Sequence, residues 1–206
     1  MPVFYGLSKV GTDRARVGGA DLRDRVVEAA VGLYSERGIR FTMDDLARRL
    51  RMSKRTIYEQ VGTKEEVLAI VIDDAFANIT ARELRIIADP ELDVVAKLKR
   101  LLTVMSDRAE IADPSMIRLA REAYPAVYDR IVYHLRTGWE QTLGLVEESV
   151  DQGRLRAVRA TVLREILLGA LDGLLREDVI AETGLTPEQA LAEVVDIVFA
   201  GLEPRS

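Results

Sequence analysis

The chain has 206 residues, of which 48% are hydrophobic and 31% charged, and its formal net charge is −5. This length suits one domain, or a small domain fused to a larger one, and it is long enough to bury a core. The absence of cysteine excludes disulfides and thiolate metal sites. No apolar run is long enough for a membrane span, and the N-terminal residues lack the basic-then-apolar pattern of a signal peptide, so we expect a cytoplasmic protein.

The charge is distributed unevenly along the chain. Residues 1–68 carry a net charge of +3, and the remaining residues carry −8. A basic N-terminal part followed by an acidic remainder is typical of a protein that binds nucleic acid with the first part and has a separate domain that does not bind DNA. Ordinary scatter of charges is the alternative explanation.

Residues 1–20 contain four glycines and no helical periodicity, which predicts a flexible N-terminal arm. Arg14 and Arg16 in this arm are candidates for contact with a DNA groove. From Asp21, apolar residues recur at steps of three and four, which predicts a helix that ends near Gly38.

Two short helices and a long one follow. Thr42 and Asp45 are spaced as a capping box, and Ser53 begins the next helix after a tight turn at Arg51 and Met52. A second capping box opens the long helix at residue 63.

Prolines divide the rest of the chain into further helices. Asp89-Pro90, Asp113-Pro114 and Tyr124-Pro125 mark helix boundaries. Beyond them, long helices are expected over about 126–152, 161–180 and 187–201. Thr186 and Gln189 are spaced as a capping box at the start of the last one. No alternating strand pattern occurs, so we predict an all-α protein of about nine helices.

The helix that begins at Ser53 has polar side chains which a core does not require. With Ile57 and Val61 facing inward, Arg55 and Tyr58 must lie off the apolar face. Lys54 stands in the first turn, where a cation opposes the helix dipole and gains more from an external anion. Such a helix is equipped to contact phosphates and base edges.

The segments 41–47, 52–58 and 64–67 together resemble the DNA-binding domain of the TetR family of bacterial regulators. The resemblance covers about residues 21–68 and keeps the family's spacing throughout. It implies a three-helix, helix-turn-helix DNA-binding domain at 21–68, and a ligand-binding and dimerisation domain at 69–206. Arg51 and Arg55 replace frequent glycines of the family, so Arg51 has to adopt the left-handed conformation of the turn. Glu59 stands where an aromatic residue or histidine is usual.

The resemblance also implies roles for single residues. Those expected to hold phosphates are Thr42, Ser53, Thr56, Gln60 and Lys64, and those expected to approach bases are Lys54, Arg55 and Tyr58. Alternatively, Tyr58 packs between helices, and Lys64 is a solvated charge at the start of a helix. Glu59 would repel phosphate unless it is paired, for instance with Arg55.

The last two long helices are apolar on more than one face, which indicates either intramolecular packing or a dimer interface. The family resemblance favours the dimer, with two helices from each subunit. The expected interface residues are Ile166, Leu167, Gly169, Ala170, Gly173, Leu174, Val194, Val195, Val198 and Phe199.

Aromatic residues gather in one part of the remaining chain. Tyr124, Tyr128, His134 and Trp139 could line an apolar ligand pocket with a few polar groups, although core packing is the alternative. With a single histidine and no cysteine, we expect neither a metal nor a cofactor, although carboxylates alone can bind a cation.

The sequence therefore predicts a TetR-like regulator that is not an enzyme. We expect a repressor that binds a pseudo-palindromic operator as a homodimer and is released by a small-molecule effector. The sequence shows no phosphate-binding loop and no nucleophile elbow. The alternative is a helical interaction module or ligand-binding protein without sequence-specific DNA binding.

Overall fold

The computed structural model describes residues 17–107 and 112–204, and within them the chain is helical with no strand. The helices of the first half are α1 Val17–Arg37, η1 Gly38–Arg40, α2 Met43–Leu50, α3 Lys54–Val61, α4 Lys64–Ala88 and α5 Val94–Thr103. Those of the second half are α6 Pro114–Ala123, α7 Pro125–Arg136, α8 Glu140–Asp151, α9 Ala160–Leu174, α10 Glu177–Thr183 and α11 Pro187–Ala200. None of the helices in these ranges has the length and apolar character needed to cross a membrane.

The ends of the helices follow from local capping. The capping boxes expected at Thr42, Thr63 and Thr186 are all present, each with its side chain accepting from the third backbone N–H of the helix. Arg51 ends α2 in the left-handed conformation with φ 54°, as its place in the turn requires. These local interactions fix where α2 ends and where α3 and α4 begin.

Three helix boundaries differ from the sequence prediction. Helix α1 begins at Val17, so residues 17–20 belong to it, while residues 1–16, with Arg14 and Arg16, lie outside the described part. The helix expected over 126–152 is two helices, because Gly138 has φ 79° and breaks it. The helix expected over 161–180 also divides, because Arg176 is extended and α10 turns back onto α6.

Two apolar cores hold the helices together. The first joins α1, α2, α3 and the N-terminal half of α4 to α6 and α7, with Phe41, Leu46, Ile57 and Leu68 fully enclosed. The second joins α5, α8, α9 and α11 around Leu98 and Val195. Since the first core includes α4, α6 and α7, the three N-terminal helices are packed firmly against the rest of the chain.

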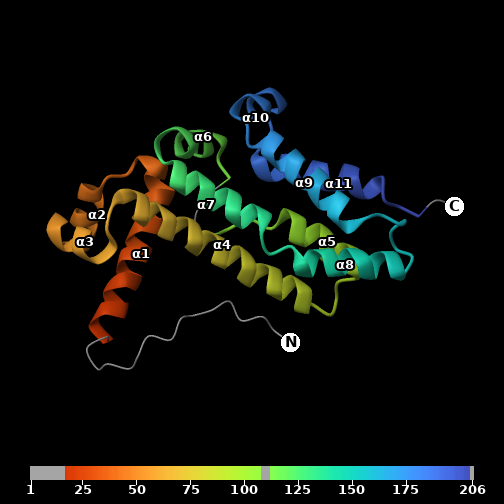
Figure 1. Ribbon diagram of the computed structural model, residues 1–206, viewed down its shortest axis with the longest axis horizontal. Coiled ribbons are helices and arrows are strands. Elements are labelled where there is room, and N and C mark those ends of the chain that lie inside the picture. Colours follow the sequence, from red (N-terminus) through yellow and green to blue (C-terminus); the bar gives the residue numbers. More distant parts are fainter. Residues whose placement is uncertain (1–16, 108–111, 205–206) are drawn as a thin grey trace.

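The helices form an elongated molecule in which α2 and α3 lie at one end (Figure 1). Helix α4 runs from this end along the molecule, with α7 beside it. Helices α9 and α11 lie side by side at the other end, against α5 and α8. The fold therefore separates α3 from α9 and α11 by most of the length of the molecule.

We predict that Asp45→Asn destabilises the protein at neutral pH and destabilises it less in acid. Hydrogen bonds from the Thr42 side chain and backbone, and then from Arg48, hold the pKa of the Asp45 carboxyl far below its ordinary value. A carboxyl with a lowered pKa stabilises the fold above its unfolded-state pKa, and this stabilisation is lost as the pH falls toward the folded-state value.

Urea unfolding of both proteins at about pH 7 and about pH 3 measures this dependence. The difference in unfolding free energy between Asp45→Asn and the unchanged protein should be largest at neutral pH and should shrink in acid. A difference that does not vary with pH would contradict the role of the ionised carboxylate.

Candidate nucleic-acid interface

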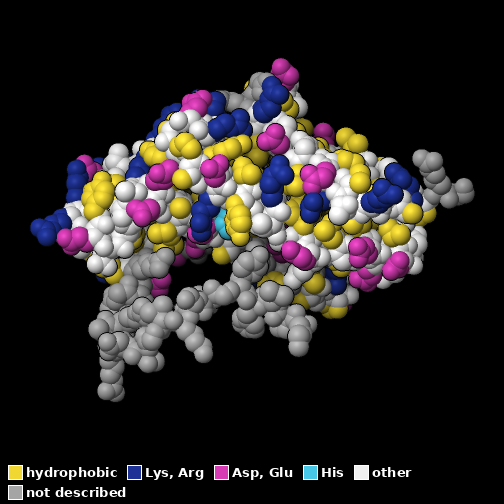
Figure 2. All heavy atoms as spheres, viewed as in Figure 1, with side chains coloured by type: hydrophobic (Ala, Val, Ile, Leu, Met, Phe, Trp, Pro, Cys, Tyr) yellow, Lys and Arg dark blue, Asp and Glu magenta, His cyan; other side chains and the backbone are white. Residues whose placement is uncertain are grey.

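Helix α3 presents a polar face to solvent at the end of the molecule. Ser53 caps the helix by accepting from the backbone N–H of Thr56 at 3.1 Å, and the burial of Ile57 and Val61 fixes its rotation. The opposite side chains Lys54, Arg55, Tyr58, Glu59 and Gln60 are exposed. Figure 2 shows basic and acidic side chains together at this end.

The two cations of α3 are already paired with carboxylates. Lys54 Nζ lies 2.5 Å from Asp44 Oδ1 on α2, and Arg55 Nε donates to Glu59 Oε1 at 2.8 Å, one turn along α3. All four side chains are at least half exposed. Glu59 therefore pairs with Arg55, as the sequence analysis considered. A phosphate that approaches α3 must compete with the carboxylates of Asp44 and Glu59.

The short hydroxyl side chains are engaged in capping. Thr42 accepts from the Asp45 backbone and donates to its carboxylate at 2.7 Å, while the hydroxyls of Ser53 and Thr56 lie 2.8 Å apart. Each of these oxygens keeps a lone pair or proton for a further partner. Their first role is to fix the starts of α2 and α3.

Lys64 is turned inward. Its ammonium donates to the carbonyl of Ile39 at 2.6 Å, and it lies 5.4 Å from the ring centre of Phe41 and 5.1 Å from that of Tyr124. It thereby connects η1, α4 and the start of α7. Lys64 is therefore not the solvated charge that the sequence left as the alternative. A contact with phosphate would use the N–H groups of the ammonium that Ile39 does not engage.

The geometry of this end agrees with a known family. Residues 26–71 match the family model described as bacterial regulatory proteins, tetR family. The DNA-binding domain is that of a TetR-family regulator. This confirms the resemblance expected from the sequence, and it makes the chain a TetR-family DNA-binding transcriptional regulator.

Individual relatives extend the similarity over most of the chain. The uncharacterized HTH-type transcriptional regulator YvaF of Bacillus subtilis is 22% identical over 178 residues, which are 86% of this chain and 94% of YvaF. A solved TetR/AcrR-family regulator from Thermobifida fusca is 24% identical, with a TM-score of 0.65 over 88% of this chain and 98% of that one. A regulator from Saccharomonospora viridis, solved in complex with choline, has 18% identity and a TM-score of 0.69, over 90% of this chain and all of the other. These structures share the all-helical fold.

The four residues expected to form a ligand pocket are not brought together. Tyr124 packs against Lys64, and Trp139 donates to the Leu135 carbonyl at 2.9 Å beside the second core. His134 faces α4, where it stacks on Phe76 with ring centres 4.4 Å apart. Tyr128 alone of the four lines a described cavity. Within the described residues no group of three or more acidic, histidine or cysteine side chains could hold a metal.

An ion-pair cluster that the sequence did not reveal joins α4 to α7. Asp73 accepts two hydrogen bonds of 2.5 Å from Arg130 and one of 2.8 Å from His134, which lies one turn further along α7. Burial raises the pKa of Asp73, but the hydrogen bonds from Arg130 and His134 outweigh it and lower the pKa overall. Because Asp73 lies 57 and 61 positions from Arg130 and His134 in the sequence, only the packing of α4 on α7 reveals the cluster.

The residues expected at a dimer interface divide into two groups. Leu167, Val195 and Phe199 lie in the second core of a single chain, so their assignment to the interface is corrected. The other seven are exposed or half-buried: Ile166, Gly169, Ala170, Gly173, Leu174, Val194 and Val198. The sequence prediction omitted Val162 and Ile197, which are 49% and 71% exposed on the same two helices.

We predict that Glu59→Gln increases the affinity for DNA of unrelated sequence. The substitution frees Arg55 and removes a charge that repels phosphate. Since an exposed pair at this spacing is worth roughly 0.3–0.5 kcal/mol, we expect a gain of about twofold or more. Titration of a random-sequence duplex at several salt concentrations measures the gain.

Glu122→Gln is the matched control, because Glu122 pairs with Arg118 at the same spacing on α6, away from α3. Glu122→Gln should leave DNA affinity unchanged. An equal gain in both variants would assign the effect to net charge instead of to the pairing of Arg55.

Proposed function

We propose that the protein is a dimeric TetR-like repressor that acts in the cytoplasm, binds a pseudo-palindromic operator and is released by a small-molecule effector. The observation that carries this proposal is the exposed polar face of α3, which a capping serine and two buried residues hold at one end of the molecule. In this proposal residues 21–68 bind DNA, and residues 69–206 bind the effector and dimerise.

The proposed DNA contacts follow from the length of each side chain and from the groups that already bind it within the chain. The long exposed side chains Lys54, Arg55 and Tyr58 would approach base edges, with Arg55 suited to guanine. Thr42, Ser53, Thr56 and Gln60 would contact phosphates. For Lys64 we favour a positioning role, because its ammonium is bound to the Ile39 carbonyl and lies near Phe41 and Tyr124.

The proposed dimer uses one outer face of α9 and α11. Val162 and Ile166 lie one turn apart on α9 and are about half exposed, and Gly169 and Gly173 continue the same side. A side chain at either glycine would meet open space within one chain, so a second helix has room to approach. Ile197 on α11 is the most exposed large apolar side chain of the described residues.

The proposed release depends on α4. Its N-terminal end is held by the contacts of Lys64, and its middle is held to α7 by Asp73. An effector that displaces α6 or α7 would therefore move α4 and change the separation of the two α3 helices in the dimer. Binding of effector and operator would then weaken each other by the same factor.

Selection of duplexes from a random DNA library at two salt concentrations tests the function. We expect a pseudo-palindromic site and a steep loss of affinity with salt. Arg55→Ala should relax the preference at one position of each half-site, at a cost of about 1–3 kcal/mol for the preferred base. No enrichment at either salt concentration would contradict the proposal and favour a helical interaction module.

Substitution of Ile197 tests the dimer. Ile197→Glu places a charge at the centre of the proposed interface and should shift the protein to a monomer at micromolar concentration, with operator affinity greatly reduced. Sedimentation velocity measures the mass. Leu84→Glu is the control, since Leu84 is 51% exposed on α4 and outside the proposed face. A dimer that survives Ile197→Glu but not Leu84→Glu would refute this interface.

A further inference from the structure

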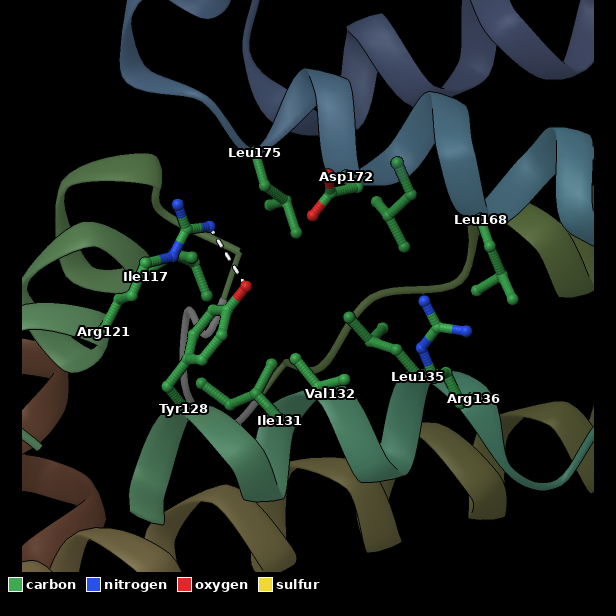
Figure 3. A pocket seen from close by; sticks show the side chains of 11 residues that line it. Ile117, Arg121, Tyr128, Ile131, Val132, Leu135, Arg136, Leu168, Asp172 and Leu175 are labelled. Atoms are coloured by element: carbon green, nitrogen blue, oxygen red, sulfur yellow. Dashed lines mark hydrogen bonds between the residues drawn. The ribbon is translucent and has the colours of Figure 1, made fainter. Parts of the chain in front are cut away.

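A cleft lies between α6, α7 and α9, on the side of α7 that faces away from α4 (Figure 3). Side chains from α7 form its floor, and side chains from α9 form its roof. The apolar lining residues are Ile117, Ile131, Val132, Leu135, Leu168, Leu171 and Leu175. Most of them are only half-buried, although isoleucine, valine and leucine are among the residues most often fully buried in proteins.

The cleft exists because α7 and α9 belong to different cores. Helix α7 is packed on α4 and α6, whereas α9 is packed on α8 and α11, and the two helices make little direct contact. The space between them has a volume of about 60 Å³. An organic ligand needs roughly 300 Å³ or more, so its entry would have to part α7 from α9.

Two arginines stand at the ends of the cleft, and neither has a carboxylate partner in the described chain. Arg121 donates to the Tyr128 hydroxyl at 3.1 Å and lies over its ring at 4.7 Å, which holds the guanidinium in place and leaves other N–H groups free. The Arg136 side chain has neither a hydrogen bond nor an ion pair among the described residues. The one acidic lining residue is Asp172 in the roof, so the cleft carries an excess of positive charge.

From these observations we propose that the cleft binds an amphipathic carboxylate, with an apolar chain between α7 and α9 and the carboxylate on Arg121 or Arg136. The distance along α7 from Tyr128 to Arg136 is about 12 Å for eight residues, which suits a medium-length chain. A guanidinium binds a carboxylate through two parallel hydrogen bonds. A cationic ligand would meet two arginines and is disfavoured.

This inference rests on the proposed function, in which the cleft is the effector site. The position of the cleft suits that role. Ile117 and Arg121 line the cleft from α6, the helix that also carries Met116. Met116 receives a hydrogen bond from the Ile39 backbone at 3.4 Å, and it packs so closely on Gly38 that a side chain there would collide with it. A ligand that moves α6 thus acts directly on the turn before α2.

The experiment measures binding of decanoate, decanol and decyltrimethylammonium to the full-length protein by calorimetry, together with operator affinity. Decanoate should bind at least about tenfold more tightly than decanol, because an ionised partner strengthens the hydrogen bonds of the arginines. The cation should not bind. Arg121→Gln and Arg136→Gln identify the end that holds the carboxylate, and the double variant should lose the preference for decanoate over decanol.

Arg118→Gln is the matched control, because Arg118 is exposed on α6, pairs with Glu122 and does not line the cleft. This variant should keep the preference for decanoate. Equal affinity for decanoate and decanol, or an equal loss in Arg118→Gln, would overturn the inference.

Operator affinity separates this inference from the proposed function. Operator binding without any decanoate binding would refute the cleft and leave the DNA-binding regulator intact. Decanoate binding that depends on the two arginines but does not alter operator affinity would support the cleft and refute release by this ligand.

Discussion

One face of α4 supports both halves of this protein. Five of its residues are 1% exposed or less and belong to the core that α1, α2 and α3 share with α6 and α7: Val67, Leu68, Val71, Ile72 and Ala75. Close-packed interiors have few voids and transmit displacement instead of absorbing it. The helix-turn-helix therefore cannot reorient independently of α4, and the contacts of Lys64 and Asp73 hold that helix at two points along its length.

The surface of α3 is balanced in charge although its composition looks basic. Lys54 and Arg55 each lie beside a carboxylate, so the field at this end is weaker than the two cations alone would create. Exposed pairs of this kind are weak, and phosphate can displace them. In a DNA-binding regulator, such pairing lowers affinity for every duplex alike, and favours sites at which base contacts compensate for the lost pairs.

Helix α7 shows why residue types alone did not locate a pocket. His134 faces α4 while Tyr128 faces α9, because positions six apart on a helix point in widely different directions. The arginines and leucines that line the cleft come from three helices, and the residue spacing within one helix does not predict which other helices lie beside it. The cluster of Asp73 with Arg130 was hidden for the same reason.

The sequence by itself determined the helical class, the capping boxes at Thr42, Thr63 and Thr186, the left-handed Arg51 and the outward face of α3. These features depend on residues within one or two helical turns, so local spacing is enough to predict them. Tertiary packing alone decided that Leu167, Val195 and Phe199 are core, that Lys64 turns inward, and that α7 and α9 leave a cleft. These features depend on which helices pack together. Apolar periodicity predicts that one face of a helix is buried, but it does not predict which other helix covers that face.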